Sequence, residues 1–118
     1  MVRERMIPHY PPDTAAVRWL PSGYIELTAL HAGTTVIQKW ITPDVAREMS
    51  VKLATPTDHT AGRVTTRWLP QGHVEVFIHY GPGSFEHLWF PADVARDLVG
   101  QLVTLLSPDR AASTPAQQ

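Results

Sequence analysis

Residues 18–47 read RWLPSGYIELTALHAGTTVIQKWITPDVAR, and residues 67–96 read RWLPQGHVEVFIHYGPGSFEHLWFPADVAR. The two copies lie 49 residues apart without a gap, and 11 of the 32 positions compared from residue 18 onward are identical. Average residue usage would give roughly two identities by chance. The sequence therefore predicts an internal duplication, in which each copy forms the same structural unit.

Each copy reads as three strands followed by one helix. Alternating apolar and polar residues predict the strands, and Pro-Ser-Gly, Ala-Gly-Thr, Pro-Gln-Gly and Gly-Pro-Gly predict the turns. Thr42-Pro43-Asp44 has the cap, proline and acidic residue of a helix start. The predicted strands are 14–20, 24–31, 35–41, 63–69, 73–80 and 84–90, and the predicted helices end near residues 54 and 106.

These elements predict an α+β fold, a tandem duplication of a β-β-β-α unit with about six antiparallel strands and two helices on one face. A single three-stranded unit is too small to be stable alone, so the two repeats should share one core. They form either one six-stranded sheet or two sheets around paired helices. The predicted segments are an irregular proline-rich arm (1–13), the first repeat (14–54), a linker (55–62), the second repeat (63–106) and a disordered tail (107–118).

Strand alternation sorts the side chains onto two faces of each sheet. The turn positions place Arg67 opposite Glu75, and Glu75 opposite Trp89, on the face away from the core. The first repeat has the equivalent residues Arg18, Glu26 and Trp40. We call these sets the first and second Arg–Glu–Trp rows. The same register places Trp19 and Trp68 in the core, and it places Lys39 on the core face, at an edge from which its amine can reach water.

Each row has two readings. Arg and Glu on neighbouring strands make a cross-strand ion pair beside a packed Trp, which is the structural reading and the one we favour. Exposed Trp and Arg are also the residues that protein interfaces prefer. Under the second reading, the candidates for binding a partner are Arg18, Glu26, Trp40, Arg67, Glu75, Phe77, Phe85 and Trp89.

Histidines gather in the second repeat. Cross-strand diagonals bring Glu75, His79 and His87 within reach of a zinc ion. However, Phe77 lies among them and the spacing matches no zinc-binding motif. We therefore favour a solvated polar face, and we predict neither a metal nor another cofactor.

The two helices carry different signals. Asp44 with Arg47, and Asp93 with Arg96, are spaced to pair at each helix start. The second helix has a wide apolar stripe, made of Val94, Leu98, Leu102, Leu105 and Leu106 with two flanking valines. So wide a stripe predicts burial against more than the three strands of its own repeat, and it is also consistent with self-association.

Composition narrows the classes of function. The formal net charge is −1, which gives no overall attraction to nucleic acid or to an anionic membrane. The chain has no cysteine, so it has neither a disulfide nor a cysteine nucleophile. No apolar run approaches the roughly 20 residues of a membrane span. A cytoplasmic protein is the expectation.

Two short stretches carry a resemblance. WITPDVAR at residues 40–47 and WFPADVAR at residues 89–96 resemble an ending found in small uncharacterised proteins of actinobacteria and their phages. In those proteins a strand runs through a Thr-Pro-type cap into a helix that contains Ala-Arg. The resemblance covers only these stretches and implies no assigned activity, so no functional residue follows from it.

The leading hypothesis from sequence is a small non-enzymatic module for protein interaction or regulation, which binds itself or another protein. One alternative is a nucleic-acid-binding protein that uses the aromatic and Arg side chains of the outer sheet face. A second alternative is a metal-binding protein or enzyme that uses the histidines of the second repeat.

Overall fold

The computed structural model describes residues 11–107, and the predicted arm and tail fall mostly outside this range. The first repeat contains β1 (Thr14–Trp19), β2 (Ile25–His31), β3 (Thr34–Ile41) and α1 (Pro43–Lys52). The second contains β4 (Val64–Trp68), β5 (His73–Gly81), β6 (Ser84–Pro91) and α2 (Ala92–Leu106). The α+β class and the repeated β-β-β-α unit are therefore confirmed.

The first turn of each repeat has the same geometry. Gly23 has φ +95° and Gly72 has φ +91°, a region of backbone conformation that glycine adopts without steric cost. The backbone N–H of Gly23 donates to the carbonyl of Leu20 at 3.0 Å, and that of Gly72 donates to Leu69 at 3.0 Å. The shared turn explains why Leu-Pro-x-Gly occurs in both copies.

Each repeat forms its own antiparallel sheet, β1-β2-β3 and β4-β5-β6. Of the two arrangements consistent with the sequence, the chain adopts two sheets rather than one sheet of six strands. The predicted register is confirmed in both: Arg18 pairs with Glu26 and Arg67 with Glu75, and each Glu pairs with the Trp of its row.

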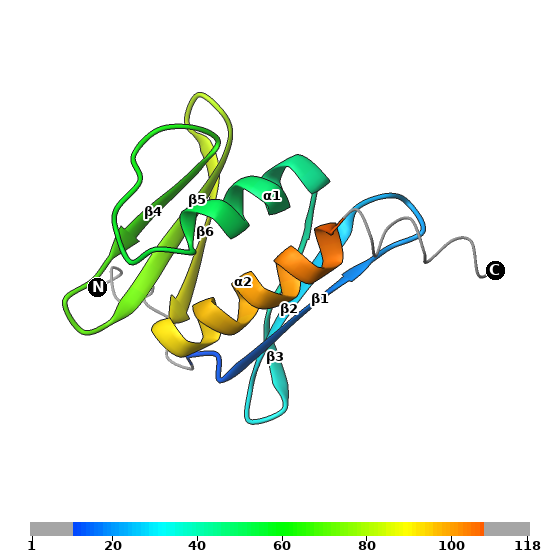
Figure 1. The fold of residues 1–118 in the computed structure, drawn as a ribbon, viewed down its shortest axis with the longest axis horizontal. Helices are drawn as coiled ribbons and strands as arrows, with labels where there is room; N and C mark the ends of the chain where they lie inside the picture. The colour runs from blue at the N-terminus through cyan, green and yellow to red at the C-terminus, as the bar shows by residue number, and fades with distance from the viewer. Residues whose placement is uncertain (1–10, 108–118) are drawn as a thin grey trace.

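The helix of each repeat packs against the first strand of the other repeat. α1 and α2 lie side by side, with α2 packed along β1 and α1 beside β4 (Figure 1). Gln101 of α2 donates from Nε2 to the carbonyl of Ala15 at 2.7 Å and accepts from the N–H of Val17 at 3.2 Å. Each repeat therefore covers the first strand of the other with its own helix.

The reciprocal contact uses charged residues. Lys52 and Glu48 occupy the positions in α1 that Gln101 and Asp97 occupy in α2. Lys52 Nζ donates to the carbonyl of Val64 at 2.6 Å and to that of Ala61, and it pairs with Glu48 Oε2 at 2.7 Å. Glu48 Oε2 in turn accepts from the N–H of Val64 at 3.0 Å. We call these two sets of contacts the edge clamps.

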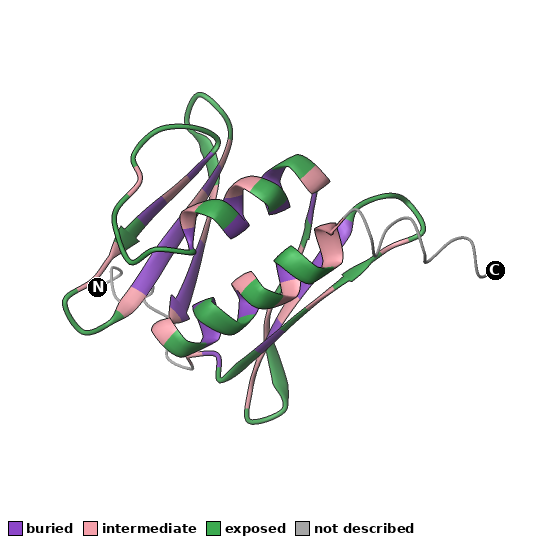
Figure 2. Cartoon of the chain, viewed as in Figure 1, coloured by how far each residue is buried: buried purple, intermediate pink, exposed green. Residues whose placement is uncertain are grey.

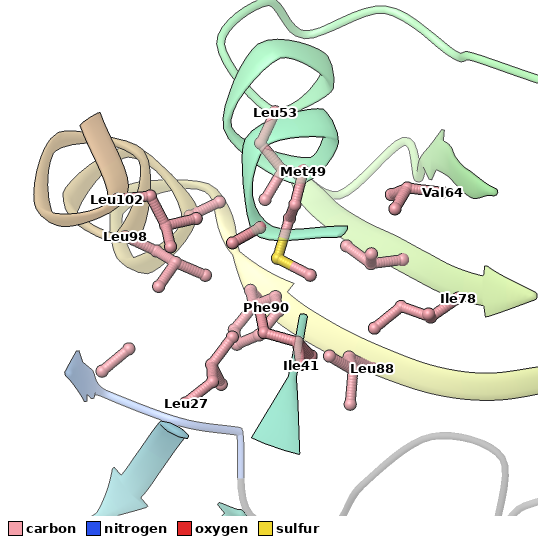
Figure 3. Packing of buried hydrophobic residues seen from close by; sticks show 14 of the residues in the cluster. Leu27, Ile41, Met49, Leu53, Val64, Ile78, Leu88, Phe90, Leu98 and Leu102 are labelled. Carbon is pink, nitrogen blue, oxygen red and sulfur yellow. The ribbon is translucent and has the colours of Figure 1, made fainter. Parts of the chain in front are cut away.

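One hydrophobic core joins the two repeats. Side chains from α1, α2 and both sheets meet around Phe90, which is fully buried, as are Met49 and Leu98 (Figure 3). Buried residues lie on the sides of the helices and sheets that face one another (Figure 2). Because α2 contacts α1, β1 and its own sheet, its wide apolar stripe is used within the chain, as the sequence predicted.

The linker follows the outer edge of β4. His59 and Thr66 exchange backbone hydrogen bonds at 3.0 and 2.9 Å. The carboxylate of Asp58 accepts from the N–H of Trp68 at 2.7 Å. These bonds, together with the Lys52 clamp, satisfy backbone groups along the edge of β4 that another strand would otherwise reach.

The two helix starts differ, contrary to the sequence prediction. At α1, Thr42 Oγ1 accepts from the N–H of Val45 at 3.2 Å, and Arg47 pairs with Asp44 at 3.1 Å. At α2, Asp93 Oδ1 accepts from the N–H of Val94 at 2.9 Å, and no pair with Arg96 forms. The prediction is therefore confirmed at the first helix and wrong at the second, where a backbone N–H holds the carboxylate.

The predicted core position of Trp19 is wrong. Trp19 is 41% exposed, and its indole N–H donates to the carbonyl of Leu105, in the last turn of α2, at 3.3 Å. Its equivalent Trp68 is half-buried and packs against the core. Lys39 has the predicted edge position and pairs with Glu86 at 3.1 Å.

Candidate functional site

The first Arg–Glu–Trp row forms a connected network. Arg18 Nε donates to Glu26 Oε1 at 2.7 Å. The other oxygen of Glu26 accepts from Gln38 Nε2 at 3.0 Å and from the indole N–H of Trp40 at 3.4 Å. Glu26 is buried, so one carboxylate orients three neighbouring side chains.

The second row has a related network with one change. Arg67 pairs with Glu75 Oε1 through two nitrogens, Nε at 2.8 Å and a terminal nitrogen at 2.6 Å. His87 takes the place of Gln38, and its Nε2 lies 3.3 Å from Glu75 Oε2, in a direction that does not make a hydrogen bond. The indole N–H of Trp89 is buried, and it has no hydrogen-bond partner in the part of the chain that the structure describes.

The two tryptophans differ in exposure. Trp40 is 64% exposed, whereas Trp89 is 4% exposed and its ring lies 4.5 Å from that of His73. Glu26 and Glu75 are also buried. Four of the candidates predicted from sequence are exposed and so accessible to a partner: Arg18, Trp40, Arg67 and Phe85. Phe77 is half-buried, and Trp89 and the two glutamates are buried.

An aromatic cluster covers the outer face of the second sheet. Phe77 stacks on His87 with ring centres 4.7 Å apart and meets Phe85 edge-on at 5.7 Å. His79 lies 5.9 Å from Phe85, and its Nε2 lies 3.0 Å from the hydroxyl of Thr65. Within residues 11–107, no three His, Cys, Asp or Glu side chains are placed to hold one metal ion. This includes Glu75, His79 and His87, the set considered from the sequence.

The charges on the outer face are paired. Arg18 and Arg67 each contact a buried carboxylate at less than 3 Å. A guanidinium that is neutralised in this way offers less attraction to a phosphate backbone. The geometry therefore gives no particular support to the nucleic-acid alternative.

A second aromatic lies close to Trp40. Gln38, Lys39 and Trp40 of β3 line an open depression together with Tyr80 of β5 and Glu86 of β6. We call these five residues the Trp40 patch. Tyr80 is 55% exposed, and its hydroxyl donates to Glu86 Oε1 at 3.4 Å. Burial, together with the Glu86 carboxylate, raises the pKa of Tyr80.

Sequence reasoning missed Tyr80 and Glu86 as members of this patch. They belong to the second repeat, whereas Trp40 belongs to the first, and strand alternation relates side chains only within one sheet. The opposite charges of Lys39 and Glu86 were the available signal, since Lys39 was the residue that fitted its predicted face least well.

Two carboxylates make stability depend on pH. The hydrogen bond from Arg18 lowers the pKa of Glu26, and this effect exceeds the opposing effect of burial. Burial raises the pKa of Glu48, but hydrogen bonds from Lys52 and the N–H of Val64 outweigh it and leave the pKa below its ordinary value. In acid the unfolded chain therefore binds more protons than the folded chain.

The free energy of unfolding is accordingly expected to be highest at neutral pH. It should fall as the pH drops below about 5 and then through the lowered pKa values of the two carboxyl groups. Urea unfolding between neutral pH and about pH 3 measures this dependence. Glu48→Gln should flatten it, because one of the two groups no longer titrates. An equal slope in the variant and the parent protein would contradict the assignment to Glu48.

None of the helices within residues 11–107 is long and apolar enough to cross a membrane. No protein family, curated protein or solved structure matches the chain.

Proposed function

We propose that the protein is a non-enzymatic interaction module that binds a second copy of itself through the Trp40 patch. Trp40 carries this proposal. Its ring is 64% exposed although its equivalent in the other repeat is buried. Tryptophan is among the side chains that contribute most to binding energy at protein interfaces.

The Trp40 ring is held before any partner arrives. Its N–H is bonded to Glu26, which Arg18 and Gln38 hold in turn. A side chain with a fixed orientation loses less conformational entropy on binding than a mobile one. The buried network therefore supports a role for Trp40 as an anchor.

The charges in the patch suit a second copy as the partner. Lys39 and Glu86 place one positive and one negative group beside Trp40, 3.1 Å apart. In a two-fold dimer each contact is made twice, so Lys39 of one copy can meet Glu86 of the other. The patch also carries no net charge that would repel its own copy.

Trp40→Ala is expected to weaken self-association about tenfold or more, as loss of a central aromatic anchor does. Sedimentation velocity from low micromolar to several hundred micromolar protein measures this change. Val51→Ala is the matched control, because Val51 is 66% exposed on α1 and lies outside the patch. It should associate like the parent protein.

Two results would count against the proposal. If the parent protein stays monomeric at several hundred micromolar, the proposed self-association is wrong. A Trp40→Ala variant that dimerises as strongly as the parent would remove the patch as the contact surface. Circular dichroism of the variant would show that the fold is retained, as the exposure of Trp40 leads us to expect.

A further inference from the structure

The first tryptophan of each repeat, Trp19 or Trp68, differs in how its indole N–H is hydrogen-bonded. Trp19 donates its indole N–H to the carbonyl of Leu105, in the last turn of α2. The indole N–H of Trp68 is buried, and no group within residues 11–107 accepts a hydrogen bond from it. The position equivalent to Leu105 is Pro56, which lies beyond the end of α1 at Lys52. The turn of helix that serves Trp19 therefore has no counterpart beside Trp68.

A cavity of about 190 Å³ is found at this position. Its apolar wall comes from Leu53, Pro56, Trp68 and Val99, and the charged residue that lines it is Arg96. Binding sites for small molecules are typically apolar with a few polar groups that fix orientation. The volume is smaller than that of a typical drug-sized pocket, so its ligand would be a compact molecule.

No carboxylate of residues 11–107 pairs with Arg96. Its equivalent Arg47 pairs with Asp44 at 3.1 Å. Asp93, which holds the corresponding position in the second repeat, accepts a hydrogen bond from Val94 instead. Across residues 11–107, Arg96 makes no ion pair. Its planar guanidinium is suited to bind both oxygens of a carboxylate.

We propose that this cavity binds a small apolar carboxylate, such as a single-ring aromatic acid or a short aliphatic acid. The carboxylate contacts Arg96, and the hydrocarbon part packs against Leu53 and Val99. The proposal is independent of the Trp40 patch, which shares no residue with the cavity.

The test is a titration of ¹⁵N-labelled full-length protein, followed by the amide and indole N–H resonances. Benzoate and hexanoate are the probes, and benzamide and hexanamide are their neutral counterparts. We expect saturable shifts at low millimolar benzoate or hexanoate, centred on the Trp68 indole and the start of α2, because ligands of this size bind weakly. The amides should bind about tenfold more weakly.

Variants assign the two parts of the site. Arg96→Gln should weaken carboxylate binding about tenfold and leave amide binding unchanged. Arg47→Gln is the matched control, since Arg47 occupies the same position in the repeat that lacks the cavity, and it should bind like the parent protein. Ala92→Leu should block both kinds of probe by filling the cavity, and the spectrum itself shows whether this variant is folded.

Three results would overturn the proposal. One is the absence of saturable shifts with either carboxylate at 10 to 20 mM, roughly the weakest binding worth assigning to a site. The second is equal affinity for the acids and their amides. The third is an Arg96→Gln variant that binds benzoate as the parent does.

Discussion

Leu98→Ala is expected to lower the free energy of unfolding by about 3 kcal/mol, within the range for a fully buried leucine. Leu98 has no exposed surface and belongs to the buried cluster that also contains residues of α1 and of both sheets (Figure 3). Because that core belongs to both repeats, the two repeats of the variant should unfold together in one transition, at a lower denaturant concentration than in the parent protein. Urea unfolding followed by circular dichroism and by tryptophan fluorescence measures this.

The matched control is Val103→Ala, at a site on the same helix that is 56% exposed. Its effect should stay within about 0.5 kcal/mol, as is usual for surface positions. Separate transitions for the two probes in Leu98→Ala would mean that the repeats unfold independently. The shared core would then be the wrong description of the molecule.

Lys52→Ala is expected to cost about 2 kcal/mol. The ammonium of Lys52 contacts two backbone carbonyls and the Glu48 carboxylate, with 16% of its side chain exposed. Removing it leaves Glu48 partly buried without its counter-charge. Breaking a fully buried pair costs about 3 to 5 kcal/mol, and the partial exposure here lowers the figure.

Gln101→Ala tests the same position in the other edge clamp. Gln101 is neutral, and it bonds the backbone of Ala15 and Val17. Gln101 Nε2 also donates to Asp97 Oδ2 at 2.8 Å, but Asp97 is exposed and water can replace this bond. The loss of Gln101 should therefore cost about 1 kcal/mol. Equal costs in the two variants, measured by urea unfolding, would show that the charge of Lys52 adds nothing to its clamp.

Most of the fold within each repeat could be predicted from sequence. Leu-Pro-x-Gly sets the turn, the turn sets the register, and the register places Glu26 between Arg18 and Trp40. These are local relations, and each is carried by neighbouring residues. The duplication strengthened them, since two independent copies gave the same register.

Relations between the repeats could not be predicted in the same way. Exchange of the helices depends on how two sheets and two helices share one core, and nothing local encodes it. For this reason the exposure of Trp19 was not foreseen. The Trp40 patch was missed in part, because it combines residues from both repeats.

The edge clamp on β1 also has a consequence for synthesis on the ribosome. Gln101 belongs to the last helix of the described chain, whereas Ala15 and Val17 lie near its beginning. The first repeat emerges long before α2, so the edge of β1 stays open to a neighbouring nascent chain until the second repeat has been made. Unpaired strand edges are where incompletely folded chains associate wrongly. We therefore expect the nascent chain to be most prone to wrong association in the interval between the synthesis of the two repeats.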